Sequence, residues 1–232
     1  MTNTLHRYGD AESFRDDYVI FAIPCKGKND EGAVEKLRAF LRVCARHNPV
    51  NIGNSDYASY QPSSQLQPSV HWKRRLTPDH AKVIEGVHRS ATVAAVFASR
   101  EAAEACLREL IEADLGLSVN VSTSVEGAKQ VATACGINRH SVEYSLGFAD
   151  PHDLLPDGHV LRLSTMCGHG MVSSNMAKKM LDMVREGRRS PREAAVTLAR
   201  FCPCGAYNPL RAQRLLEEGS YWSNEGRPGD ER

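Results

Sequence analysis

The 232-residue chain carries 29 Lys and Arg residues against 28 Asp and Glu residues, which gives a formal net charge of +1. A chain so close to neutrality has no overall field to attract DNA, RNA or an acidic membrane, so nucleic acid is not an expected partner. Hydrophobic residues make up 41% of the chain and charged residues 25%, a composition typical of a globular protein with a buried core.

The ends and the cysteines indicate where the protein works. No stretch approaches the roughly 20 apolar residues of a membrane-spanning helix, and the first residues are polar and acidic, unlike a signal peptide. We therefore expect no membrane partner and a cytoplasmic location. The odd number of 7 cysteines argues against a disulfide framework, which leaves buried thiols, metal ligands or a catalytic thiol.

The first half of the chain alternates strand-like and helical patterns. An apolar, β-branched run at 18–23 predicts a buried strand, and apolar residues at helical spacing follow through 34–45. A second apolar run at 92–98 predicts another strand, after which Ser99 is placed to cap a helix. Alternation with period two at 117–122 predicts a third strand, and a further helix is expected at 125–135.

The remaining segments of this half are less regular. The stretch 50–78 is rich in Ser, Gln, Tyr and Pro, and we expect a lid or an irregular excursion there, followed by a short helix at 78–87. Two further strand-like runs lie at 141–146 and 159–164.

Together these patterns predict an α/β (or α+β) fold with a mixed sheet of about four to five strands covered by helices, for which a ferredoxin-like arrangement is one solution. From Met171 onward the patterns are helical: one amphipathic stripe ends at Gly187, a capping box begins at Ser190, and a third helix opens at Pro209. We expect an α/β domain over 1–165 and a C-terminal helical segment over 166–232, whose helical hairpin carries the cysteine clusters.

Two glycine-flanked stretches bracket this hairpin, MCGHGM at 166–171 and FCPCG at 201–205. Cys167 and His169, like Cys202 and Cys204, are one residue apart, and such a pair chelates one ion only where glycine lets the backbone bend tightly. A hairpin returns the chain to its starting point, so the sequence predicts a site that holds a zinc ion or a [4Fe–4S] cluster. The alternative is that the three thiols are buried hydrophobes and His169 is a capping residue.

The number of ligands decides the chemistry of such a site. If all four residues bind zinc, the site is closed and structural. If only Cys167, Cys202 and Cys204 bind, a [4Fe–4S] cluster keeps one iron open and leaves His169 as a catalytic acid or base, while zinc with a bound water would hydrolyse or hydrate a substrate.

The flanking glycines favour an approachable site. We therefore expect a metal-dependent enzyme that performs hydrolysis, hydration or elimination on a small polar molecule as its substrate. The alternative is a non-catalytic metal-binding, redox or accessory protein. The sequence does not decide whether the chain forms a homo-oligomer.

The other cysteines are assigned by their surroundings. Cys25 follows the first predicted strand beside Lys26 and Lys28, whose charges would favour its thiolate, so Cys25 is a second catalytic candidate. The alternative is a half-buried cysteine between two solvated lysines. The remaining thiols fall on helical stripes or helix ends and are expected to pack in the core: Cys44, Cys106 and Cys135.

Overall fold

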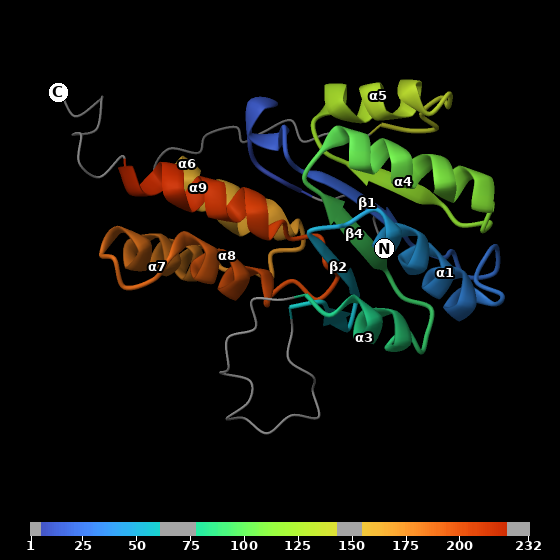
Figure 1. Cartoon of the computed structure of the whole chain (residues 1–232), viewed down its shortest axis with the longest axis horizontal. Coiled ribbons are helices and arrows are strands. Elements are labelled where there is room, and N and C mark those ends of the chain that lie inside the picture. Colours follow the sequence, from blue (N-terminus) through green and yellow to red (C-terminus); the bar gives the residue numbers. More distant parts are fainter. Residues whose placement is uncertain (1–5, 61–77, 143–154, 222–232) are drawn as a thin grey trace.

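The computed structural model of the chain describes residues 6–60, 78–142 and 155–221 (Figure 1). The strands are β1 (Tyr18–Ala22), β2 (Asn51–Asn54), β3 (Tyr57–Ala58), β4 (Val93–Phe97) and β5 (Val119–Ser122). The helices are the 3-10 turns η1 (Glu12–Phe14) and η2 (Thr165–Cys167) and the α-helices α1 (Ala33–Arg46), α3 (His80–Glu85), α4 (Arg100–Ala113), α5 (Val125–Ala134), α6 (Gly158–Ser164), α7 (Ser174–Arg185), α8 (Pro191–Ala199) and α9 (Pro209–Tyr221).

The five strands form one sheet in the order β3-β2-β4-β1-β5, and every strand pair in it is antiparallel. β4 inserts between β1 and β2, and α1 and α4 follow β1 and β4 along the chain. This is the ferredoxin-like βαββαβ plan with β3 added at one edge. The predicted fold class, an α/β or α+β sheet of four to five strands covered by helices with helices at the C-terminal end, is confirmed, although the sheet is antiparallel throughout and not mixed.

Both faces of the sheet are covered, which explains why β1 and β4 appear in the sequence as unbroken apolar runs. Val19 and Phe21 of β1 face the C-terminal helices, whereas Ile20 between them faces α1 and α4. Figure 1 shows α6 to α9 on one side of the strands and α1, α4 and α5 on the other. A second helical layer thus covers the sheet face opposite α1 and α4.

The strand predicted at 159–164 is wrong, because these residues form α6. The apolar residues Val160, Leu161 and Leu163 fit period two and helical spacing alike, so the cap decides. Asp157 Oδ1 accepts hydrogen bonds from the backbone N–H groups of His159 at 2.8 Å and Val160 at 3.3 Å. These bonds satisfy two of the donors that a helix start leaves free, so the turn residues before the run determine its conformation.

The excursion predicted at 50–78 is only partly irregular, because β2 and β3 form a hairpin at its start. Residues 61–77 of the excursion, and residues 143–146 of the strand predicted at 141–146, lie outside the described residues. The short helix predicted at 78–87 is present as α3. Within the described ranges, no helix has the length and hydrophobicity needed to span a bilayer.

The C-terminal helices pack as a compact layer in which α7 contacts α8 and both contact α9. The capping box predicted at Ser190 is confirmed: Ser190 Oγ accepts the Glu193 N–H at 3.3 Å, and Glu193 Oε2 accepts the Ser190 N–H at 3.3 Å. Gly187 ends the preceding helical segment in the left-handed region with φ of 67°. The chain therefore reverses between α7 and α8, which closes the predicted hairpin.

Replacing Ser190 with alanine is expected to lower the free energy of unfolding by about 1 kcal/mol, because the start of α8 loses its side-chain acceptor. Ser190→Gly is the matched variant, since glycine at this position costs only a few tenths of a kcal/mol. Urea unfolding followed by circular dichroism measures both variants. Equal losses for alanine and glycine would show that the capping box does not stabilise α8.

Candidate metal centre

The structure brings together the four residues that the two glycine-flanked stretches supply. Cys167 ends η2, His169 lies between η2 and α7, and Cys202 and Cys204 lie in the connection between α8 and α9. The Sγ atoms of Cys202 and Cys204 are 3.5 Å apart, and Cys204 Sγ is 3.6 Å from His169 Nδ1. The Cys167 thiol in turn interacts with the side chains of Cys202 and His169. The four side chains therefore form a closed ring of pairwise contacts.

The Cys202–Cys204 turn rests directly on the backbone of β2. A Cβ atom added to Gly53 would lie 2.5 Å from the Pro203 carbonyl oxygen and from the backbone carbon of Cys204. Asn51 Nδ2 also donates a 2.9 Å hydrogen bond to the Tyr207 carbonyl oxygen. The sheet thus fixes one half of the ring, and the start of α7 supplies the other half.

Backbone N–H groups point at two of the three thiols. Cys167 accepts from the N–H groups of His169 and Met171, and Cys204 accepts from the N–H of Ala206. Gly168 and Gly205, which directly follow the two cysteines, have φ of 73° and 77°, and this left-handed conformation turns the chain back toward the sulfur atom. Such bonds favour the thiolate, which is the form of cysteine that binds metals.

The ring shifts the pKa values of its members in opposite directions. Hydrogen bonding from Cys202 lowers the pKa of Cys167 to about 4 and that of Cys204 to about 6, with His169 and the backbone N–H groups adding to the effect. Hydrogen bonds to Cys167 and then Cys204 raise the pKa of His169 to about 10. The pKa of Cys202 is raised, first because it donates to Cys167. Without an ion, the ring thus holds thiolates against an imidazolium.

Burial differs between the sulfur and imidazole sides of the ring. Cys167 and Cys202 are 0% exposed and Cys204 is 5% exposed, whereas His169 lies at the surface. Two apolar residues next to the ring in sequence are exposed as well, Met171 at 56% and Phe201 at 44%. The ring therefore reaches solvent through its histidine.

Within residues 6–60, 78–142 and 155–221, no group of three or more His, Cys, Asp or Glu side chains meets the geometry of a ready-made metal site. The ring consists of pairwise contacts, so its side chains would have to readjust to surround one ion. Its donor set of three sulfurs and one imidazole nitrogen nevertheless suits a soft or borderline metal ion.

The other predicted residues lie elsewhere. Cys25 is exposed on the turn after β1, where its N–H donates to Asn29 Oδ1 at 2.6 Å, and in the described ranges no hydrogen bond joins its thiol to the ring. Its catalytic role stays a prediction. The core packing predicted for Cys44 and Cys106 is confirmed, since both are buried with their sulfurs 3.7 Å apart. Cys135 is half-buried against the same core.

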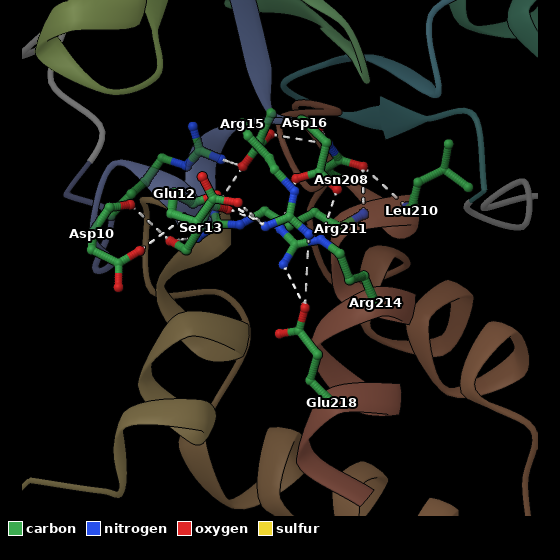
Figure 2. A network of polar contacts seen from close by, with 12 residues as sticks. Asp10, Glu12, Ser13, Arg15, Asp16, Asn208, Leu210, Arg211, Arg214 and Glu218 are labelled. Atoms are coloured by element: carbon green, nitrogen blue, oxygen red, sulfur yellow. Dashed lines mark hydrogen bonds and ion pairs between the residues drawn. The ribbon is translucent and has the colours of Figure 1, made fainter. Parts of the chain in front are cut away.

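Sequence reasoning missed a buried ion network between α9 and the N-terminal segment. Figure 2 shows Arg211 of α9 reaching toward the N-terminal turn η1, with Arg214 paired to Asp16 and Glu218. Arg211 Nη1 donates to Asp17 Oδ2 at 2.7 Å, and Arg7 pairs with the same oxygen. The sequence offered one signal: Asp16 and Asp17 stand directly before the first buried strand, and no basic residue near them in sequence was an evident partner.

A broad, open hollow lies between β5, α5 and the N-terminal segment, and none of the four ring residues lines it. Comparison of the chain with models of protein families, with curated proteins and with solved structures found no match. The function is therefore inferred from the geometry of the ring.

Proposed function

We propose that Cys167, His169, Cys202 and Cys204 bind a single zinc ion. The observation that supports this is the spacing of the donor atoms. In a tetrahedral site with Zn–S bonds of about 2.3 Å and a Zn–N bond of about 2.0 Å, two sulfurs lie about 3.8 Å apart and a sulfur and a nitrogen about 3.5 Å apart. The Cys202 and Cys204 sulfurs are 3.5 Å apart, and the Cys204 sulfur is 3.6 Å from His169 Nδ1.

The same spacing favours zinc over a [4Fe–4S] cluster. In a four-iron cluster each thiolate binds a different iron, so the cysteine sulfurs lie farther apart than two thiolates that share one ion. The 3.5 Å between Cys202 and Cys204 is compatible with two ligands on one metal, and the imidazole of His169 beside this pair distinguishes it from the core pair Cys44 and Cys106, whose sulfurs are 3.7 Å apart. Backbone N–H bonds to Cys167 and Cys204 suit a zinc thiolate site, since partners in the outer shell fix the ligands and tune the metal.

The role that this arrangement supports best is structural. The four ligands come from two chain segments that α7 and α8 separate, and one of these segments rests on β2. An ion shared between them would hold the C-terminal helices against the sheet. We therefore favour a non-catalytic protein whose C-terminal helices are stabilised by zinc.

A metal-dependent enzyme is the second candidate, because His169 is the one ligand that reaches solvent. If this imidazole leaves the ion, the fourth position faces solvent, where zinc lowers the pKa of a bound water to about 7. His169 would then move protons while the three thiolates hold the metal. The reaction would be hydrolysis, hydration or elimination of a small polar molecule.

Elemental analysis of the untagged recombinant chain, purified without oxygen, tests the proposal. We expect about one zinc per chain, no visible colour, and a cobalt-substituted form with the intense absorption of a tetrahedral thiolate site. Cys204→Ser should lose the metal, whereas Cys135→Ser, which removes a thiol outside the ring, should keep it. Iron with broad absorption in the blue would show that the ring binds an iron–sulfur cluster and not zinc. Absence of any bound metal would overturn the proposal.

The cobalt-substituted protein also separates the two roles. In a closed site, added azide or thiocyanate leaves the cobalt spectrum unchanged, and His169→Ala weakens cobalt binding. In an open site, the anion shifts the spectrum of the wild-type protein, and His169→Ala keeps the metal. A spectrum that shifts with anion would therefore favour the enzyme.

The predicted cytoplasmic location also stays a proposal. All seven cysteines are free in the structure, which suits a reducing compartment.

A further inference from the structure

The turn between α8 and α9 places two thiols in a geometry that a disulfide bond can join. Cys202 and Cys204 flank Pro203, and the Gly205 N–H closes the turn with a 3.3 Å hydrogen bond to the Cys202 carbonyl oxygen. A turn of this kind keeps the two Cα atoms within the roughly 7 Å that a disulfide spans. The two sulfurs lie on the same side of the turn, 3.5 Å apart. Rotation of the side chains is therefore the movement that brings them to the S–S bond length of about 2.05 Å.

Exposure distinguishes the three cysteines of the ring. Cys167 and Cys202 are 0% exposed, whereas Cys204 is 5% exposed and its sulfur lies 3.6 Å from Nδ1 of the exposed His169. Oxidation of a cysteine follows its thiolate character and its exposure, and a bound metal keeps its cysteine ligands as thiolates. A small oxidant that enters beside the imidazole therefore meets the Cys204 sulfur first, with the Cys202 sulfur directly behind it.

A second close pair of thiols lacks this access. The sulfurs of Cys44 and Cys106 are 3.7 Å apart, but both residues are 0% exposed. They belong to α1 and α4 and pack in the apolar core on the opposite face of the sheet. Burial raises the pKa of Cys44 well above its ordinary value, which keeps this cysteine as an unreactive thiol. Close sulfurs alone therefore do not decide where an oxidant acts, and the protein contains its own control pair.

We propose that Cys202 and Cys204 form a redox switch on the metal centre, in which a hydroperoxide oxidises the pair to a disulfide and the zinc ion leaves. This rests on the proposed zinc site. The Cys204 thiolate attacks one peroxide oxygen, the O–O bond breaks, and hydroxide leaves behind a sulfenic acid. The Cys202 thiolate then attacks the Cys204 sulfur, the S–S bond forms, the S–O bond breaks, and a second hydroxide leaves. Two electrons thus pass from the two sulfurs to the peroxide, and the ion keeps only Cys167 and His169.

The new bond does not replace the ion as a support. The zinc ion would join two chain segments that α7 and α8 separate, whereas the disulfide closes within the single turn 202–204. A disulfide that closes so short a loop restrains little of the chain. Oxidation therefore loosens the C-terminal helices, and a thiol reductant reverses the change.

Hydrogen peroxide added to the zinc-loaded, untagged chain tests the switch. A metallochromic dye measures the released zinc, and mass spectrometry after alkylation in denaturant locates the bond. The tryptic peptide 201–211 contains Cys202 and Cys204 and no other cysteine, so the disulfide makes this peptide two hydrogens lighter and blocks its alkylation. We expect equal amounts of released zinc and of this disulfide, with Cys44 and Cys106 alkylated, and renewed zinc binding after dithiothreitol. Cys25→Ser removes an exposed thiol outside the ring and should release zinc at the wild-type rate.

The metal-free chain separates the switch from the zinc site. It should form the same bond faster, because no ion occupies the thiolates. Zinc release without the bond in peptide 201–211, a bond from Cys167 to either thiol, or earlier oxidation of Cys44 and Cys106 would overturn the proposal. A chain that binds no zinc would refute the zinc site and with it the release of an ion, and the thiol chemistry then stands or falls with the bond in peptide 201–211.

Discussion

If the ring binds zinc as proposed, removing the ion with a chelator is expected to lower the midpoint of thermal unfolding by about 10 °C. An ion that binds only the folded chain adds its binding free energy to stability, about 4 kcal/mol when its concentration is 1,000 times the dissociation constant. In the proposed site this free energy is concentrated where the Cys202–Cys204 turn meets the start of α7. The chelator should therefore act on one layer of the protein first.

Hydrogen exchange measured by mass spectrometry locates the effect. After chelation, amides of α7, α8 and the connection to α9 should exchange faster, whereas those of β1 and β4 should keep their protection, because α1 and α4 still cover one face of the sheet. Cys204→Ser should exchange like the chelated protein whether or not a chelator is present, and Cys135→Ser should respond like wild type. Loss of metal without faster exchange in α7 and α8 would show that the ion does not hold this layer.

The sequence predicted the central parts of the fold for a physical reason. β1 and β4 are covered on both faces, so each appears as a continuous apolar run, and the helices carry caps such as Ser99 and Ser190. β2 gave no such signal. Its buried Asn51 and Asn54 are there for their hydrogen bonds, to the carbonyl oxygens of Tyr207 and Val83, and period-two hydrophobicity cannot indicate a strand built in this way.

The candidate site, too, was predictable only in part. Local spacing, flanking glycines and a hairpin were enough to predict that Cys167 and His169 would meet Cys202 and Cys204. The buried ion network between α9 and the N-terminal segment was not predictable, because its partners are distant in the chain. Arg211 and Asp17 are 194 positions apart, and neither has a local pattern that indicates burial. The spacing thus indicates where donor atoms gather, and the binding of zinc by this ring stays a proposal.

Replacing Gly205 with alanine is expected to be among the most damaging single substitutions in the C-terminal layer, with a loss of about 3 kcal/mol or more in the free energy of unfolding. Two causes add at this position. Gly205 has φ of 77°, a conformation that costs an L-residue about 1–2 kcal/mol. In addition, its new Cβ would overlap the backbone of Ile52 and Gly53, which belongs to β2 and cannot move aside as a flexible side chain would.

Two other glycines separate these causes. Gly187 has φ of 67° and open space where a methyl group would lie, so Gly187→Ala should show the backbone cost alone, about 1 kcal/mol. Gly53 lacks a positive φ, but a Cβ added to it would lie 2.5 Å from backbone atoms of the Cys202–Cys204 turn. Gly53→Ala should therefore show the clash alone, and it should also weaken cobalt binding by displacing that turn. Urea unfolding and cobalt titration of all three variants measure both effects. If Gly53→Ala and Gly205→Ala keep wild-type cobalt affinity, β2 does not position the metal ligands, because any displacement of the turn moves two of the four donor atoms.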